Sequence, residues 1–159
     1  MTTLDSIVAA IQQHEGYIPP GVDARYPQGS LSFRNNNPGN LTYAGQPGAV
    51  LGDGGRFARF ATYEDGAAAL ANQVKLDASR GLTLEGFLHK FAPASENNTG
   101  AYIASVSAAT GIAPGQSLSN AIAGEASLPP FSRSSARRSI SPQPGHPTPG
   151  YPLPPIRRT

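Results

Sequence analysis

Residues 33–41 read Phe-Arg-Asn-Asn-Asn-Pro-Gly-Asn-Leu, and no other stretch of the chain says as much about its structure. Four asparagines within six residues supply many amide donors and acceptors, and Pro38-Gly39 among them predicts a tight turn. Such residues are not expected to build a hydrophobic core. They suit a neutral, polar ligand rich in hydroxyl and acetamido groups, and a carbohydrate fits that description.

Upstream of this asparagine stretch the sequence predicts an amphipathic helix that ends at Glu15. Thr2 or Thr3 can cap its start, and Gly16 is the residue type expected just past a helix end. Apolar side chains recur at helical spacing on one face, at Leu4, Ile7, Val8 and Ile11.

Glu15 lies on this apolar stripe, four residues after Ile11. Burial and the negative end of the helix dipole would both favour its neutral, proton-bearing form. A general acid that protonates a glycosidic oxygen needs such a proton. The alternative is that the helix ends a turn early and Glu15 points into solvent, as most surface glutamates do.

The remainder of the chain predicts a mainly α, α+β fold with a small antiparallel hairpin or sheet. Prolines and glycines argue against regular structure in residues 17–40, whereas Asp53-Gly54-Gly55 predicts a hairpin turn. Strands are expected at residues 41–43, 49–51 and 56–60, and helices beginning at Thr62, at Thr83, at Asn98 or Thr99, and at Ser117.

Charge and composition divide the chain into a domain at residues 1–123 and a tail at residues 124–159. The tail has five arginines against one glutamate, a net charge of +4, and nine of the sixteen prolines. The domain has seven basic against nine acidic residues, a net charge of −2. The tail is predicted to be disordered or polyproline-like. It is either a solvated linker, which we favour, or a basic segment that binds a partner, nucleic acid, another anionic polymer or a membrane surface.

Several functional classes are excluded or disfavoured. Cysteine is absent, so disulfides, thiolate metal sites and thiol nucleophiles are excluded. The histidines are scattered, so neither a metal nor a cofactor is expected. No signal peptide is visible, and the apolar runs are shorter than the roughly 20 residues that span a bilayer. We expect a monomer.

Five short segments form a recognisable set: His14-Glu15-Gly16-Tyr17, Arg34 through Leu41, Phe91-Ala92-Pro93, Glu96-Asn97-Asn98-Thr99 and Tyr102-Ile103-Ala104-Ser105-Val106. Together they resemble phage and bacterial proteins of the lysozyme-like superfamily, related to soluble lytic transglycosylases and goose-type lysozymes. The resemblance covers roughly residues 4–112 and implies a lysozyme-like fold.

By this resemblance Glu15 matches the catalytic glutamate, and Asn40 replaces a glutamine that lines the cleft. The Tyr102 hydroxyl would lie near the glutamate or the sugar, and Asn97 belongs to the matching Glu96–Thr99 element. Asn36 and Asn37 would help to position the glycan. Two departures are Gly16, where the family has serine, and an unrecognisable Ala-Tyr-Asn element. Tyr63 is a distant stand-in for that element and either stacks on a sugar or forms an edge of the core.

The implied activity is peptidoglycan cleavage between N-acetylmuramic acid and N-acetylglucosamine, by a lytic transglycosylase that uses one glutamate. Hydrolysis would need a second carboxylate, and Asp53, Glu64 and Asp65 each have a plainer explanation in a turn or a first helical turn. The alternative is a non-catalytic glycan-binding or virion/secretion-apparatus module of the same fold. The protein would be phage-associated, or exported to the cell wall by a route other than a signal peptide.

Overall fold

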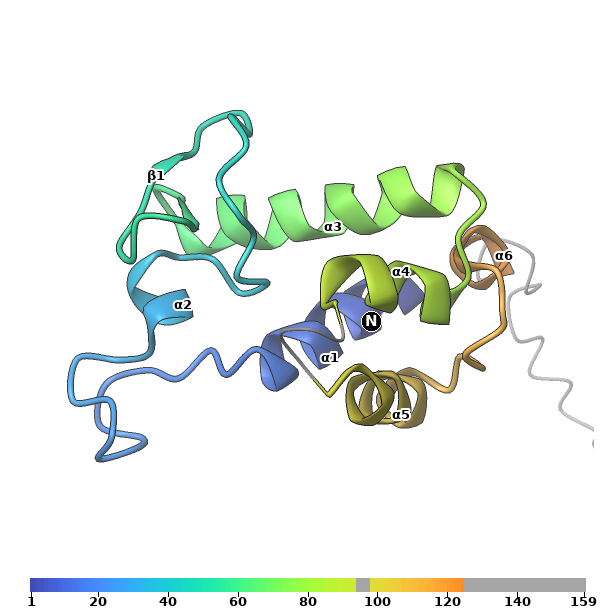
Figure 1. Cartoon of the computed structure of the whole chain (residues 1–159), viewed down its shortest axis with the longest axis horizontal. Helices are drawn as coiled ribbons and strands as arrows, with labels where there is room; N and C mark the ends of the chain where they lie inside the picture. The colour runs from blue at the N-terminus through green and yellow to red at the C-terminus, as the bar shows by residue number, and fades with distance from the viewer. Residues whose placement is uncertain (94–97, 125–159) are drawn as a thin grey trace, which may run out of the picture. The chain divides into compact units, whose positions relative to one another are not determined.

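The computed structural model describes residues 1–93 and 98–124, which all belong to one compact unit, Met1–Leu128. The predicted tail lies outside the described residues apart from Gly124. Figure 1 shows the elements in chain order: α1 (Thr3–His14), α2 (Leu31–Arg34), β1 (Val50–Leu51), β2 (Ala58–Arg59), α3 (Tyr63–Ser79), α4 (Leu84–Phe91), α5 (Thr99–Thr110) and α6 (Leu118–Ala123).

The described fold is mainly helical with a two-stranded antiparallel sheet, which confirms the predicted α+β class. Helix α1 packs against α3, α5 and α6, while α4 contacts α3 and α5. Figure 1 shows the long helix α3 along one side, with α2 and the hairpin gathered near its first turns. The largest fully buried apolar side chains come from these helices: Ile7, Ile11, Leu70, Val74, Leu84, Phe87, Leu88, Tyr102, Val106 and Leu118.

Helix α1 begins and ends where the sequence predicts. The Thr2 side chain accepts a hydrogen bond from the Asp5 amide, and the Asp5 carboxylate accepts one from the Thr2 amide. After the cap residue Glu15, the chain turns away at Gly16, whose φ of 68° is in the left-handed region that glycine tolerates. These local interactions place Glu15 at the end of the helix.

The predicted lack of regular structure in residues 17–40 is wrong at one place. Residues Leu31–Arg34 form the single helical turn α2, because the Ser30 hydroxyl accepts a hydrogen bond from the Phe33 amide and caps it. No glycine or proline interrupts residues 30–37, so nothing prevents this turn.

Two of the four asparagines lie in the interior, although none belongs to the hydrophobic core, as expected. Asn35 and Asn37 are fully buried. The Asn35 amide donates to the Asp53 carbonyl and accepts from the Asp53 N–H, so it holds the hairpin turn. Asn37 donates to the carbonyls of Leu41 and Ala58 and accepts from the Leu41 N–H. Each side-chain amide therefore provides hydrogen-bond partners for backbone N–H and C=O groups that have none in a helix or sheet.

The predicted hairpin is confirmed, although it is short. Val50 pairs with Arg59 and Leu51 with Ala58 in antiparallel register. The third predicted strand, residues 41–43, is reduced to a single bridge between Thr42 and Phe57.

The four later helices are confirmed with side-chain caps at Thr62, Thr83, Asn98 and Ser117. The first turn of α3 approaches the asparagine stretch so closely that a Cβ on Gly66 would lie 1.8 Å from the Asn36 carbonyl oxygen. Within residues 1–93 and 98–124, no helix is long and apolar enough to cross a membrane.

Candidate functional site

Glu15 lies half-buried at the end of α1, in the wall of a cavity of about 190 Å³. Its backbone N–H donates to the Ile11 carbonyl at 2.8 Å, so the last turn of α1 holds it in place. The opposite walls come from the loop after the asparagine stretch, the hairpin and the end of α4. The described residues that line this cavity are Glu15, Asn40, Thr42, Arg56, Phe57, Phe91 and Pro93.

Two side chains from distant parts of the chain donate to the Glu15 carboxylate. The Tyr102 hydroxyl, from α5, lies 2.9 Å from Oε1, and the Asn40 amide nitrogen lies 3.1 Å from Oε2. Tyr102 is fully buried, and burial together with the neighbouring Glu15 carboxylate raises the pKa of its phenol. Tyr102 therefore keeps its proton, and with it its role as a donor, to a higher pH than an ordinary tyrosine.

The surroundings of Glu15 differ from the expected apolar environment, since both carboxyl oxygens have a polar partner. The same partners accommodate the neutral acid, because a protonated carboxyl keeps acceptor lone pairs on both oxygens, so Oε2 can still accept from Asn40 and Oε1 from the Tyr102 hydroxyl. The side-chain carbonyl oxygen of Asn40, Oδ1, is buried and has no hydrogen-bond partner among the described residues. If its amide turned over, this oxygen would accept a hydrogen bond from proton-bearing Glu15.

The backbone explains why asparagine occupies positions 36 and 40. Both residues have positive φ, 49° and 45°, where asparagine is tolerated better than other non-glycine residues. The Asn40 N–H donates to the Asn37 carbonyl at 3.0 Å, which closes the turn through Pro38-Gly39. This turn brings the Asn40 side chain to the end of α1.

His14 is a residue of the site that sequence reasoning missed. Its ring stacks on the Tyr102 ring, with centroids 3.7 Å apart and planes 12° apart. His14 is nevertheless exposed. Only the packing of α1 against α5 brings the two rings together, so no local pattern could have revealed the contact.

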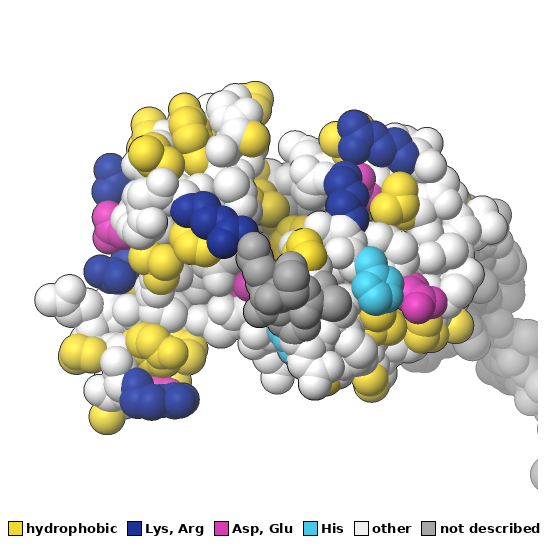
Figure 2. Space-filling model, in the orientation of Figure 1, with side chains coloured by type: hydrophobic (Ala, Val, Ile, Leu, Met, Phe, Trp, Pro, Cys, Tyr) yellow, Lys and Arg dark blue, Asp and Glu magenta, His cyan; other side chains and the backbone are white. Residues whose placement is uncertain are grey.

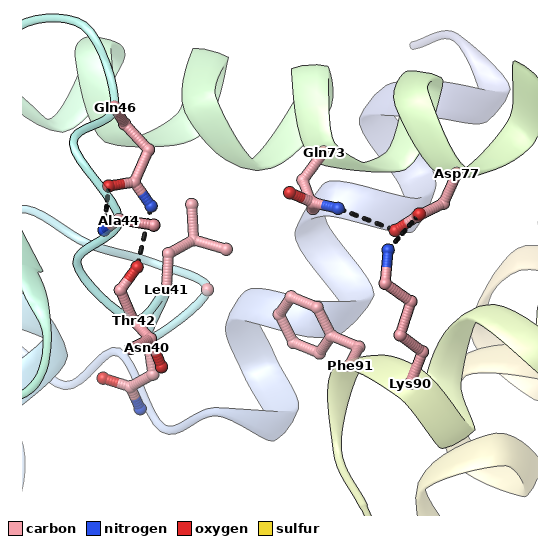
Figure 3. A pocket seen from close by; sticks show the side chains of 10 residues that line it. Asn40, Leu41, Thr42, Ala44, Gln46, Gln73, Asp77, Lys90 and Phe91 are labelled. Carbon is pink, nitrogen blue, oxygen red and sulfur yellow. Dashed lines mark hydrogen bonds and ion pairs between the residues drawn. The ribbon is translucent and has the colours of Figure 1, made fainter.

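A second cavity of about 240 Å³ continues the first, because the two share Asn40, Thr42 and Phe91 in their walls. We refer to the two together as the cleft. Figure 3 shows the second cavity between the loop of residues 40–46 and the facing helices α3 and α4. Its far wall carries Gln73, Asp77 and Lys90.

Asp77 is a buried carboxylate whose partners surround it. Gln73 donates to Oδ2 at 2.7 Å, and the Lys90 ammonium donates to Oδ1. Arg80 lies 3.4 Å from the same Oδ1 atom. Burial by itself raises the pKa of Asp77, but the hydrogen bonds from Lys90 and Gln73 and the two positive charges outweigh it and lower the pKa overall.

The structure does not bring all the predicted site residues to the cleft. Asn36 donates to the carbonyls of Phe60 and Ala61, and Asn37 is buried with its amide fully occupied by backbone groups. Tyr63 donates to Gln12 at 2.6 Å and packs on Tyr17 in a separate cavity of about 530 Å³. Asn97 lies outside the described residues. Of the predicted set, the described structure brings together Glu15, Asn40 and Tyr102.

Glu15 is the sole carboxylate among the described residues that line the 190 Å³ cavity. Asp53 lies in the hairpin turn, 3.6 Å from Arg34 and 3.8 Å from Arg59. Glu64 and Asp65 lie in the first turn of α3, where acidic side chains are favoured by the helix dipole. In the part of the chain that the structure describes, no group of three or more His, Asp or Glu side chains could hold a metal ion.

When the chain was compared with protein-family models, with curated proteins and with solved structures, nothing matched.

Proposed function

We propose that the chain is a lysozyme-like, peptidoglycan-cleaving enzyme that acts as a lytic transglycosylase on the bond between N-acetylmuramic acid and N-acetylglucosamine. The observation that carries the proposal is the placement of one half-buried carboxyl, Glu15, in a cleft wall between the Tyr102 hydroxyl and the Asn40 amide. An acid for glycosidic bond cleavage needs such a positioned carboxyl at the leaving oxygen.

In the proposed reaction the Glu15 proton passes to the glycosidic oxygen while the bond from that oxygen to the anomeric carbon breaks. The resulting carboxylate then takes the proton of the sugar's own 6-hydroxyl, whose oxygen bonds to the anomeric carbon and closes an anhydro ring. Tyr102 and Asn40 hold the carboxyl through both steps, because each can remain bonded to it. The absence of a second carboxylate from the described cavity wall supports this route over hydrolysis.

The decisive variant is Glu15→Gln, which keeps the shape of the side chain and cannot donate a carboxyl proton. We expect it to abolish the release of muropeptides from purified sacculi while its thermal unfolding stays close to that of the unsubstituted protein. Glu64→Gln is the matched control, because Glu64 is an exposed carboxylate outside the cleft, and it should retain activity. Undiminished release by Glu15→Gln would overturn the proposal, and mass analysis of the products for anhydro ends separates transglycosylation from hydrolysis.

A glycan-binding module without turnover is the second candidate. It is favoured by the two donors on Glu15, since a carboxylate fixed in this way could also serve as an acceptor for sugar hydroxyls. Retention of the protein on insoluble peptidoglycan without any soluble product would establish this candidate in place of the enzyme.

A further inference from the structure

The far end of the cleft from Glu15 is lined by Gln73, Asp77 and Lys90, and we call it the lysine end. None of these three residues lines the cavity at Glu15, and Glu15 does not line the cavity at the lysine end. A ligand that filled both cavities would therefore contact Glu15 with one part and Lys90 with another. In Figure 3, Gln73 from α3 and Lys90 from α4 converge on Asp77 at this wall.

Lys90 is the positive group of the lysine end. Its partner Asp77 is fully buried and is also approached by Arg80, which does not line the cleft, so Lys90 is not the sole cation that neutralises this carboxylate. Lys90 keeps 47% of its side chain exposed, and its bond to Asp77 uses one of three N–H donors. Figure 2 shows Lys and Arg side chains on both sides of the hollow in the middle of this face. The cleft can thus hold an anionic group.

Gln73 adds a second, complementary group. Because its amide nitrogen donates to Asp77, its carbonyl oxygen is directed away from Asp77, as Figure 3 shows. The neighbouring walls at Leu41 and Phe91 are apolar. An ammonium donor, an amide acceptor and apolar walls together match an acyl substituent that carries both a carboxylate and an N–H group.

We propose that the lysine end binds a carboxylate carried by the substituent of muramic acid, and that Lys90 thereby determines specificity for muramic acid polymers over uncharged glycans. The inference rests on the proposed function, because it takes the glycan to lie across Glu15. The carboxylate belongs to the lactyl group where the strand carries no peptide, or to the peptide stem where one is attached and the lactyl carboxyl is an amide. Both are recognised by the same chemistry.

Binding measured with three ligands in the Glu15→Gln background tests this proposal, since no ligand is then cleaved. The ligands are a chitin hexamer without carboxylates, glycan strands freed of peptide, which keep the lactyl carboxylates, and strands with intact stems. We expect Lys90→Met to weaken carboxylate-bearing strands about tenfold or more and the chitin hexamer less than about twofold. In intact strands the lactyl carboxyl is an amide, so loss confined to the peptide-free strands identifies the lactyl carboxylate and loss confined to intact strands identifies a stem carboxylate. Equal loss on both shows that the site takes either carboxylate.

Arg80→Met is the matched control. Arg80 contacts the same Asp77 oxygen and is similarly exposed, at 54%, but does not line the cleft. The Arg80→Met variant should lower thermal stability about as much as Lys90→Met while leaving the affinities for all three ligands unchanged. Lys90→Arg, which keeps the positive charge, should bind the carboxylate-bearing strands as the unsubstituted residue does. If Lys90→Met and Arg80→Met behave alike, or if Lys90→Met weakens all three ligands equally, the proposal is overturned and Lys90 only neutralises Asp77.

If Lys90→Met fails to fold, a second measurement uses the Glu15→Gln protein itself and compares its affinity for carboxylate-bearing strands with its affinity for the chitin hexamer. Its affinity for carboxylate-bearing strands relative to the chitin hexamer should fall as salt is added, because ions screen the exposed ammonium. A salt-independent ratio would overturn the proposal. If Glu15 proves non-catalytic while Lys90→Met still weakens carboxylate-bearing strands, the proposed function fails and the carboxylate site stands. If the protein cleaves sacculi through Glu15 but Lys90→Met does not weaken these strands, the proposed function stands and the carboxylate site fails.

Discussion

At Glu15, three residues separated widely in the sequence form one hydrogen-bonded group. Tyr102 follows Glu15 by 87 positions and Asn40 by 25, yet both donate to the same carboxyl. The phenol is fully buried, whereas Asn40 is partly exposed in a turn at the cavity wall.

Tyr102→Phe tests the hydroxyl alone, because it keeps the buried ring and the His14 stack. We expect kcat/KM for sacculus cleavage to fall about tenfold or more, as the loss of a donor to a charged group removes about 1.5–3 kcal/mol. Thermal unfolding should shift by a few degrees. The exposed Tyr26→Phe serves as the control. Activity unchanged in Tyr102→Phe would show that the hydroxyl has no part in the reaction.

Asn37→Asp distinguishes a structural from a ligand-binding role for the buried asparagines. An ionised carboxylate cannot donate to the carbonyls of Leu41 and Ala58 and would be buried without a counter-charge. We expect the free energy of unfolding in urea to fall by about 3 kcal/mol or more. The exposed Asn72→Asp should change it by less than about 0.5 kcal/mol. A stable Asn37→Asp protein with lost glycan binding would favour the ligand role instead.

At the scale of elements, helix α3 packs closely against the asparagine stretch, which continues into the part of the cleft wall that contains Asn40. Gly66 permits the contact with the Asn36 carbonyl, and the same stretch continues to Asn40. The position of this helix is thus coupled to the geometry at Glu15 through a few residues of backbone.

Gly66→Ala has two opposing effects on stability, a gain in helix propensity and a steric clash. Alanine favours a helix by about 1 kcal/mol over glycine, but its Cβ would lie 1.8 Å from a backbone oxygen that cannot move independently. We expect a net loss of about 2 kcal/mol or more in unfolding free energy, measured by chemical denaturation. Gly100→Ala in α5 is the control, because the nearest atom would be 3.8 Å away, and it should not destabilise. A stabilised Gly66→Ala protein would contradict the close contact.

At the scale of the whole molecule, the buried Asp77 group joins α3 to α4 and contributes to the pH dependence of stability. The folded protein lowers the pKa of Asp77 below the ordinary value of 3.8. Between the folded and the ordinary value the unfolded chain binds more protons, so the unfolding free energy falls as the pH falls. The contribution is fully present above the ordinary value and is lost as the pH falls through the folded one.

Asp77→Asn should remove this contribution. We expect the variant to be less stable than the unsubstituted protein near neutral pH, and the difference to shrink as the pH falls below 3.8. Urea unfolding at a series of pH values measures both curves. A difference that stays constant down to the lowest pH, or that grows, would show that Asp77 does not titrate with a lowered pKa.

The sequence by itself determined the helices α1, α3, α4, α5 and α6, their caps, and the hairpin. These depend on apolar periodicity and on side chains that bond within a few residues, so the information is local. The sequence did not predict α2, because a single helical turn is too short to show a helical repeat of apolar residues. It also determined that Glu15 ends a helix and that a tight turn lies at Pro38-Gly39.

Only the tertiary structure decided which amides face the cleft and which hold the backbone. Asn37 and Asn40 are the same residue type three positions apart, and local pattern cannot tell that one is enclosed by the hairpin while the other reaches α1. The contacts of Tyr102 with Glu15 and of Lys90 with Asp77 likewise arise from helices meeting through apolar packing. Burial and long-range pairing depend on the whole chain, and so the site became visible only in three dimensions.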